Sequence, residues 1–334
     1  MNDSPTHREP YLLRLGRRLA TGLAGLDETR RQAHRQFLIS QQNPDGGFSG
    51  RVVRDEDDNP HQPLERDSDL YYTSFAVRAL ALIDEFKAAD AERVAAYLSQ
   101  SGRSRASVID VVSWLYCAVM VQLAEGPDVL STASANWPER LAATLEEFRT
   151  NDGGYAKTRE GAVGSTYHTF LVALCLELIG QPLREPGRVI EFLLGRRRDD
   201  GGFVEIAPMK QSGTNPTAAA IAILQMHDAV TDDIRAGVED FLTSVRGDDG
   251  GFQANARIPF SDSLSTFTGY LTCLDLNLTD VLSPKKIRKF LAELELKHGG
   301  YRAAIWDNAA DVEYTFYGLG LTALVRSSES SPQP

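Results

Sequence analysis

A short turn motif recurs along this chain at nearly regular spacing. Four copies read Asp-Gly-Gly followed by Phe or Tyr, and a fifth reads His-Gly-Gly-Tyr; they begin at Asp45, Asp152, Asp200, Asp249 and His298. The last three steps are 48, 49 and 49 residues, whereas the first is 107. A period of this length is the signature of a repeat architecture. Because the first step is a little over two periods, one further unit without the motif fits there, and we expect six units.

Each unit contains two stretches of different helical character. The first is amphipathic, with apolar residues at i, i+3, i+4 and i+7, as in Ile287, Phe290, Leu291 and Leu294. The second is apolar on nearly every side, as in residues 217–226, which is typical of a helix buried all round. We therefore predict an all-α fold, an (α/α)6 toroid: a closed barrel of six helix-hairpin repeats, with six outer and six inner helices.

The repeated motif itself indicates structure rather than chemistry. Glycine adopts positive φ at little cost, the Asp can accept hydrogen bonds from neighbouring backbone, and the aromatic residue can pack against the next unit. Five catalytic copies in one chain would be improbable, whereas punctuation of a repeat is expected. At two other helix starts, Asn215 and Ser283 each precede a proline and are predicted N-caps.

The chain divides into one large domain and two short ends. Residues 29–326 hold the repeats, 1–28 form an N-terminal amphipathic helix and arm, and 327–334 are expected to be a disordered tail. The N-terminal helix carries apolar residues at helical spacing and a basic side. Two interpretations stay open for it: packing against the toroid, or contact with a membrane or a partner.

Charge and composition restrict the partners. A net charge of −11 argues against a nucleic-acid surface, which needs a concentrated basic face. No stretch reaches the roughly 18 uncharged apolar residues of a membrane span. The cysteines Cys117, Cys175 and Cys273 lie in apolar helical runs, as buried free thiols do. We expect a reducing, cytoplasmic location.

The first copy of the repeat, Phe37-Leu38, Gln41 and Asp45-Gly46-Gly47-Phe48, resembles the repeat of protein prenyltransferase β subunits. It is also similar to the repeat of squalene and terpene cyclases. The resemblance covers roughly residues 29–326. It implies six inner helices around an aromatic-lined funnel that holds an isoprenoid or prenyl-diphosphate ligand, and it raises the possibility of a partner subunit.

The candidate site lies where the inner helices begin. In a closed ring of hairpins all six inner-helix N-termini meet at one end, where free N–H groups and the helix dipoles favour anions. Asp69, Asp262 and His168 are the catalytic candidates at this end. The predicted substrate-binding residues are the aromatic and basic residues of the same region: Tyr71, Tyr72, Tyr167, Arg257, Trp306, Tyr314 and Tyr317.

The zinc site of prenyltransferases is incomplete in this sequence. The family opens its fifth and sixth inner helices with an Asp-x-Cys pair and then a His. Here Asp262 matches the Asp, but Leu264 stands at the Cys position and Tyr314 at the His position. Catalytic zinc needs about three protein ligands, so we predict no bound zinc and no other cofactor. Arg257 falls near the family's diphosphate-binding basic residues.

The acidic motif of class II terpene cyclases is also incomplete. That motif, Asp-x-Asp-Asp-Thr, opens an inner helix, and its middle Asp protonates an alkene or epoxide. Aligned on Thr73, only Asp69 matches; residues 55–58 are acidic but belong to a predicted loop. The chain also lacks room for the second helical domain that cyclases generally have.

Several functions therefore stay open. The first is a prenyltransferase β-subunit-like protein that handles an isoprenoid without the catalytic zinc. The alternatives are a terpene-cyclase-like enzyme, a non-catalytic isoprenoid carrier, and a toroid scaffold for protein interaction that uses the long loop at residues 51–66.

Overall fold

The chain is all-helical where the structure describes it. The computed structural model describes residues 9–51, 67–101, 107–130, 136–278 and 280–330. Within these ranges there are thirteen helices and only isolated β-bridges, with no strand. The acidic run at 55–58 and most of the loop at 51–66 lie outside the described residues.

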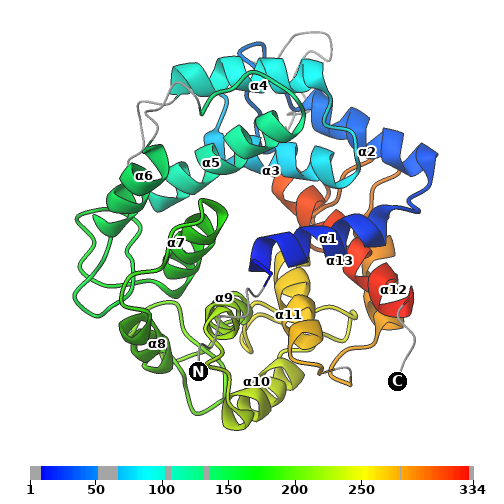
Figure 1. Cartoon of the computed structure of the whole chain (residues 1–334). Coiled ribbons are helices and arrows are strands. Elements are labelled where there is room, and N and C mark those ends of the chain that lie inside the picture. The colour runs from blue at the N-terminus through cyan, green and yellow to red at the C-terminus, as the bar shows by residue number, and fades with distance from the viewer. Residues whose placement is uncertain (1–8, 52–66, 102–106, 131–135, 279, 331–334) are drawn as a thin grey trace, which may run out of the picture.

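Twelve of the helices form two concentric rings (Figure 1). The outer ring consists of α2 (Glu28–Ser40), α4 (Ala88–Ser101), α6 (Trp137–Glu146), α8 (Pro186–Leu194), α10 (Asp232–Ser244) and α12 (Pro284–Leu294). The inner ring consists of α3 (Leu70–Leu82), α5 (Val108–Leu123), α7 (Thr166–Leu178), α9 (Thr214–Met226), α11 (Ser263–Asp275) and α13 (Val312–Ser330). Each inner helix packs against the next and α13 packs against α3, so the ring closes. The predicted (α/α)6 toroid is confirmed.

The first glycine of each turn brings neighbouring units into backbone contact. Gly201 has φ +83°, and a Cβ added there would lie 2.0 Å from the carbonyl oxygen of Gly237 in α10. The turn therefore approaches the next outer helix too closely for any side chain. The equivalent pairs are Gly46 with Arg93, Gly153 with Arg188, Gly250 with Lys286, and Gly299 with Ala33.

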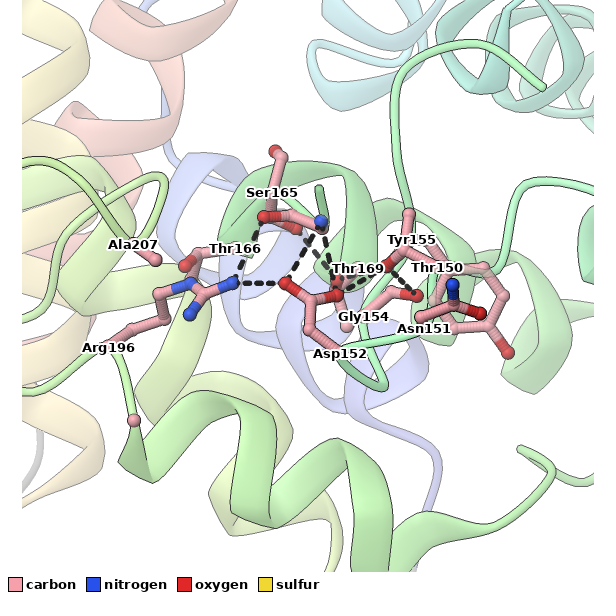
Figure 2. Close-up of polar contacts among 12 residues, drawn as sticks. Thr150, Asn151, Asp152, Gly154, Tyr155, Ser165, Thr166, Thr169, Arg196 and Ala207 are labelled. Atoms are coloured by element: carbon pink, nitrogen blue, oxygen red, sulfur yellow. Dashed lines mark hydrogen bonds and ion pairs between the residues drawn. The ribbon is translucent and has the colours of Figure 1, made fainter. Parts of the chain in front are cut away.

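A threonine of the inner helix holds the aromatic end of each turn. In the third unit the backbone N–H of Tyr155 donates to Thr169 Oγ1 at 2.9 Å, and Thr169 Oγ1 donates to the Ser165 carbonyl at 2.7 Å (Figure 2). The same backbone-to-threonine bond recurs at 2.9 Å on Thr73, Thr217, Thr266 and Thr315. The second unit lacks the motif, and Val111 stands at the position of this threonine, four residues after the N-cap Ser107.

The motif aspartates are bound to nearby groups, as expected for a structural role. Asp152 accepts hydrogen bonds from the Thr150 hydroxyl at 2.5 Å and from the Gly164 N–H at 3.2 Å, and it pairs with Arg196 (Figure 2). Asp200 accepts from the Gly202 N–H at 3.1 Å. The carboxylates thus stabilise the turns in which they lie.

The seam between the last and first units uses a different acceptor. In three units the motif aspartate accepts the N–H of the second glycine. The last unit has His298 in place of this aspartate, and the Gly300 N–H donates instead to His34 Nδ1 of α2 at 3.0 Å. The His34 ring stacks on Tyr301 and its Nε2 lies 3.2 Å from Glu295. A side chain from the first unit therefore completes the sixth turn.

The thirteenth helix, α1 (Tyr11–Leu23), crosses the end of the ring where the inner helices finish (Figure 1). The Glu177 carboxylate at the end of α7 accepts the Tyr11 and Leu12 N–H groups at 2.7 and 3.2 Å. Arg18 pairs with Asp275 at 2.8 Å. Packing on the toroid, the first interpretation of this segment, is what the structure shows. No helix among the described residues is long and apolar enough to span a membrane.

Two helix boundaries differ from the sequence expectation. Ser283 caps α12 as predicted, but α9 begins after Gly213, so Asn215 lies inside its first turn and its prediction as N-cap is wrong. The repeated bond to Thr217 sets this register, and Pro216 is tolerated because a first-turn N–H has no helical partner. At the other end, α13 continues to Ser330, into the predicted tail.

The seam offers a test of ring closure. Gly299→Ala would place a methyl group about 2.1 Å from the Ala33 carbonyl, whereas Gly180, also at positive φ, has no neighbouring atom within 4 Å. Gly180→Ala should cost about 1–2 kcal/mol of backbone strain. Gly299→Ala should lower the free energy of unfolding by about 1–3 kcal/mol more. Urea denaturation measures both, and equal losses would contradict the closed seam.

Candidate functional site

The shared register of the inner helices places six side chains at one level of the ring. In five of the six units the same threonine contact fixes the turn on its helix, and in all six units the N-cap sets the register of the inner helix, so the residues two positions after each N-cap are equivalent. All six are only partly buried, although the outer ring surrounds the inner helices. They are Tyr71, Ile109, Tyr167, Asn215, Leu264 and Glu313. This level lies at the predicted end, where the inner helices begin.

Two of these residues form a hydrogen bond across adjacent helices. The Tyr71 hydroxyl of α3 donates to Glu313 Oε1 of α13 at 2.7 Å. Burial raises the pKa of Glu313 to about 7, and the charges of Asp311 and Asp262 act in the same direction; the Tyr71 bond and the Arg78 charge oppose them. Close to neutral pH, this carboxyl group is therefore partly protonated.

Aromatic rings surround this pair. Tyr71 lies 4.9 Å from Phe75, which lies 5.4 Å from both Phe316 and Tyr317 of α13 (centroid distances). We call the following residues the aromatic cluster: Tyr71, Tyr72, Phe75, Phe267, Phe316 and Tyr317. Burial raises the pKa of Tyr167 to about 12, and Glu313 and Arg78 lie close enough to affect it. Four predicted tyrosines, Tyr71, Tyr72, Tyr167 and Tyr317, thus share one electrostatic environment with Glu313.

The predicted Tyr314 joins the same region from the carboxylate side. Burial raises its pKa to about 12, and the charges of Glu313, Asp262 and Asp311 add to this rise. The mouth of the ring thus combines tyrosines with acidic groups, as the sequence indicated.

The predicted catalytic carboxylates are helix caps. Asp69 is exposed and accepts the N–H groups of Tyr71 and Tyr72 at 2.8 and 3.2 Å. Asp262 accepts the Ser265 N–H and its hydroxyl, both at 2.7 Å, and burial raises its pKa. Capping accounts for both positions, and a catalytic role for either stays a prediction.

His168 belongs to a second polar group at the start of α7. Its Nδ1 lies 2.6 Å from Ser165 Oγ, which also donates to the Glu205 carboxylate. The Nε2 atom of His168 is buried and has no hydrogen-bond partner in the described structure. Burial lowers the pKa of His168 to about 4. The carboxylate bonds the serine rather than the ring, so this is not a Ser-His-acid triad.

Two predicted substrate-binding residues lie apart from the aromatic cluster. Arg257 is exposed in the loop before α11. Trp306 is 63% exposed in the loop before α13 and packs edge-on against Phe260. A ligand contact for either residue stays a prediction.

Sequence reasoning missed Arg78. It lies two turns further along α3, and its guanidinium carbon is 4.2 Å from the Phe75 ring, 4.7 Å from Phe316 and 4.9 Å from Tyr116. Its Nε donates to the Ser74 carbonyl at 3.0 Å. A signal existed: besides Arg326 near the end of α13, Arg78 is the one Arg or Lys that the inner helices contain.

The described residues do not fit the zinc of prenyltransferases. Leu264 has no donor atom, and Tyr314 is a poor zinc ligand with a pKa raised further from ionisation. No three His, Cys, Asp or Glu side chains group as metal ligands in the part of the chain that the structure describes.

Comparison with known families places the chain. The family model of the prenyltransferase α/α toroid domain matches residues 16–204 and 117–329. The chain belongs to the prenyltransferase α/α toroid family. No curated protein matches it in sequence. Membership agrees with the resemblance drawn from the turn motif.

Solved structures share the fold with low identity. Candida albicans protein geranylgeranyltransferase-I, complexed with GGPP, has a TM-score of 0.66 at 12% identity over 86% of this chain and 89% of that one. The type II terpene cyclase MstE from Scytonema has 0.58 at 14% identity over 94% and 99%. An α-1,6-mannanase from Salegentibacter has 0.53 at 11% identity over 93% and 98%. These likenesses show the fold alone.

The pKa of Glu313 predicts a pH-dependent stability. The folded protein holds this proton up to about pH 7, whereas an unfolded glutamate releases it near pH 4.5. Between these values the folded state binds more protons, so stability falls as pH rises. Glu313→Gln has no such titration. The difference in free energy of unfolding between this variant and wild type should therefore shift in favour of the variant by about 1–3 kcal/mol from pH 5 to pH 8. Urea denaturation at both pH values measures it, with the exposed Glu293→Gln as control; parallel curves for Glu313→Gln and wild type would contradict the assignment.

The donor set predicts that purified protein contains no stoichiometric zinc. Inductively coupled plasma mass spectrometry measures the metal content directly. One equivalent of zinc, lost in Asp262→Ala, would overturn this prediction.

Proposed function

We propose that this protein binds an isoprenoid chain against the aromatic cluster and protonates it through Glu313, as a terpene-cyclase-like enzyme. The observation that carries the proposal is the Tyr71–Glu313 hydrogen bond within that cluster. Tyr71 occupies Oε1 of the carboxyl group, so the acidic proton on Oε2 is free for a substrate. A carboxyl group with a pKa of about 7 supplies a proton near neutral pH.

The chemistry follows from the groups around Glu313. Transfer of its proton to an alkene carbon forms a C–H bond and leaves a carbocation, while Glu313 becomes a carboxylate. Attack by a second alkene closes a ring, and loss of a different proton from the cyclised cation to the Glu313 carboxylate ends the reaction and restores the acid. The π faces of the cluster stabilise the cation by about 0.5–2 kcal/mol per contact. The Tyr71 hydroxyl and the Arg78 charge stabilise the carboxylate.

Two further observations favour this reaction over prenyl transfer. The thiol-activating zinc lacks its ligands at Leu264 and Tyr314. In addition, the sequence expectation that a cyclase needs a second helical domain does not hold here. This chain alone covers 99% of the MstE chain. A type II terpene cyclase of this length therefore exists, and a second helical domain is not required.

Cytoplasmic location remains part of the proposal. Its support is that Cys117, Cys175 and Cys273 are free and buried. A partner subunit is proposed only on the family resemblance.

Deuterium labelling tests the reaction. Incubation with geranylgeraniol, geranylgeranoic acid or geranylgeranyl diphosphate in D2O should give an isomeric product carrying one deuterium on carbon. Because only protonated Glu313 is active, the rate should fall as pH rises through about 7. Mass spectrometry measures both the product and the label.

The matched variants separate chemistry from binding. Glu313→Gln should abolish labelling yet keep thermal stabilisation by the ligand, and Glu293→Gln should behave as wild type. If wild type binds these isoprenoids but none of the three products carries deuterium on carbon, the protein is a carrier. Absence of binding would favour the scaffold interpretation.

A further inference from the structure

Arg78 is a cation inside the inner ring with no carboxylate partner in the described structure. The ion pairs of the described residues do not include it. Its guanidinium lies among rings from three inner helices, Phe75 of α3, Tyr116 of α5 and Phe316 of α13. The Ser74 carbonyl and hydroxyl accept its hydrogen bonds at 3.0 and 3.4 Å. A guanidinium group has five N–H donors. Those of Arg78 donate to Ser74 in the described structure, and none donates to an anion.

The surroundings of Arg78 do not compensate its charge. Arg78 is partly buried. Each cation–π contact contributes about 0.5–2 kcal/mol, and the partial loss of water around the charge is not offset by an opposite charge at ion-pair distance. The ionisable groups whose pKa its charge influences include Tyr116, Cys117, Tyr167, Glu313 and Tyr317. Glu313 lies beyond ion-pair distance and is the one carboxyl group among them. An anion from outside the chain would complete the site.

Arg78 also lies at the closed end of the ring. Counted from the N-caps, Leu174 of α7 and Ala222 of α9 occupy the same position as Arg78 on α3. These two residues pack against Tyr11 and Leu15 of α1. The helix α1 therefore forms a floor at the level of Arg78. An isoprenoid chain anchored at Arg78 would extend away from α1, toward the inner-helix N-termini and past Glu313.

We propose that Arg78 binds the anionic head of an isoprenoid acid or phosphate inside the ring, with the hydrocarbon chain directed outward. This inference rests on the proposed function and specifies its substrate class. It reverses the orientation expected from the helix dipoles, in which the hydrocarbon tail enters first and the head stays at the mouth near Arg257. A planar guanidinium suits a carboxylate or a phosphate, which it can bind through two parallel N–H groups.

Head-inward binding also links substrate recognition to the acid. The Arg78 charge lowers the pKa of Glu313. A bound anion offsets that charge, so Glu313 holds its proton more tightly once the substrate is in place. A carbon–carbon double bond of the bound isoprenoid then meets a protonated carboxyl group.

Paired ligands test the head group directly. Isothermal titration calorimetry compares geranylgeranoic acid, geranylgeranyl phosphate and the neutral geranylgeraniol on wild type and Arg78→Gln. Wild type should bind at least one anion about tenfold or more tightly than the alcohol. Arg78→Gln should lose this preference and keep its affinity for the alcohol within a few-fold. The relative affinities of acid and phosphate identify which head the site takes.

Three further variants keep the result interpretable. Arg78→Lys should retain part of the preference, and the exposed Lys289→Gln should retain all of it. If Arg257→Gln, rather than Arg78→Gln, loses the preference, the head lies at the mouth and the inference is overturned. Full anion preference in Arg78→Gln overturns it as well. Equal binding of alcohol and anions by wild type refutes the head site alone, whereas failure of all three ligands refutes the proposed function.

The unliganded variant supplies a folding check. Because Arg78→Gln removes an unpaired charge, its melting temperature without ligand should not fall below that of wild type. If it does fall, Arg78→Met, which preserves apolar volume, replaces it in the titrations with the same expected outcomes.

Discussion

The whole ring depends on backbone contact between a turn glycine and the next outer helix. At Gly201 and Gly299 that approach leaves no room for a β-carbon, so the spacing between units is set by main-chain atoms. The threonine below each turn then fixes the inner helix at the same height. A common height is what brings Tyr71 and Glu313 together, although 242 residues separate them in the sequence. The site is thus a product of the repeat geometry.

Sequence reasoning recovered the fold because its signals are local and repeated. The glycine motif and the helical periodicity predicted six units, two rings and closure. The start of α9 was missed because Asn215-Pro216 satisfies the local rule for a cap, while the competing constraint, the bond from Phe203 to Thr217, joins two segments. The bond from Gly300 to His34 could not be foreseen for the same reason, since its acceptor lies at the other end of the chain.

The site was predicted only in part. Its tyrosines follow from their position at the helix starts, and four of them do share an environment. Glu313 was visible at the opening of its helix, but its pKa depends on charges from α3 and α11, which a single segment does not reveal. Arg78 looked like an isolated charge in an apolar helix. Arg257 was assigned from the family resemblance and Trp306 as one of the aromatic residues of the same region, and the structure places both on exposed loops.

The seam at His34 also bears on how the chain is made. Its partner Gly300 lies 266 residues later, so a ribosome has synthesised most of the protein before this contact can form. The helix α1 is synthesised before the other twelve helices, yet it packs against α13, which is synthesised after them. Until then its apolar side has no final partner, and five hairpins stand as an open arc with two unpaired edges. Nascent chains are thus most exposed to aggregation just before α13 is available to pack, and a chaperone that shields α1 would act during that interval.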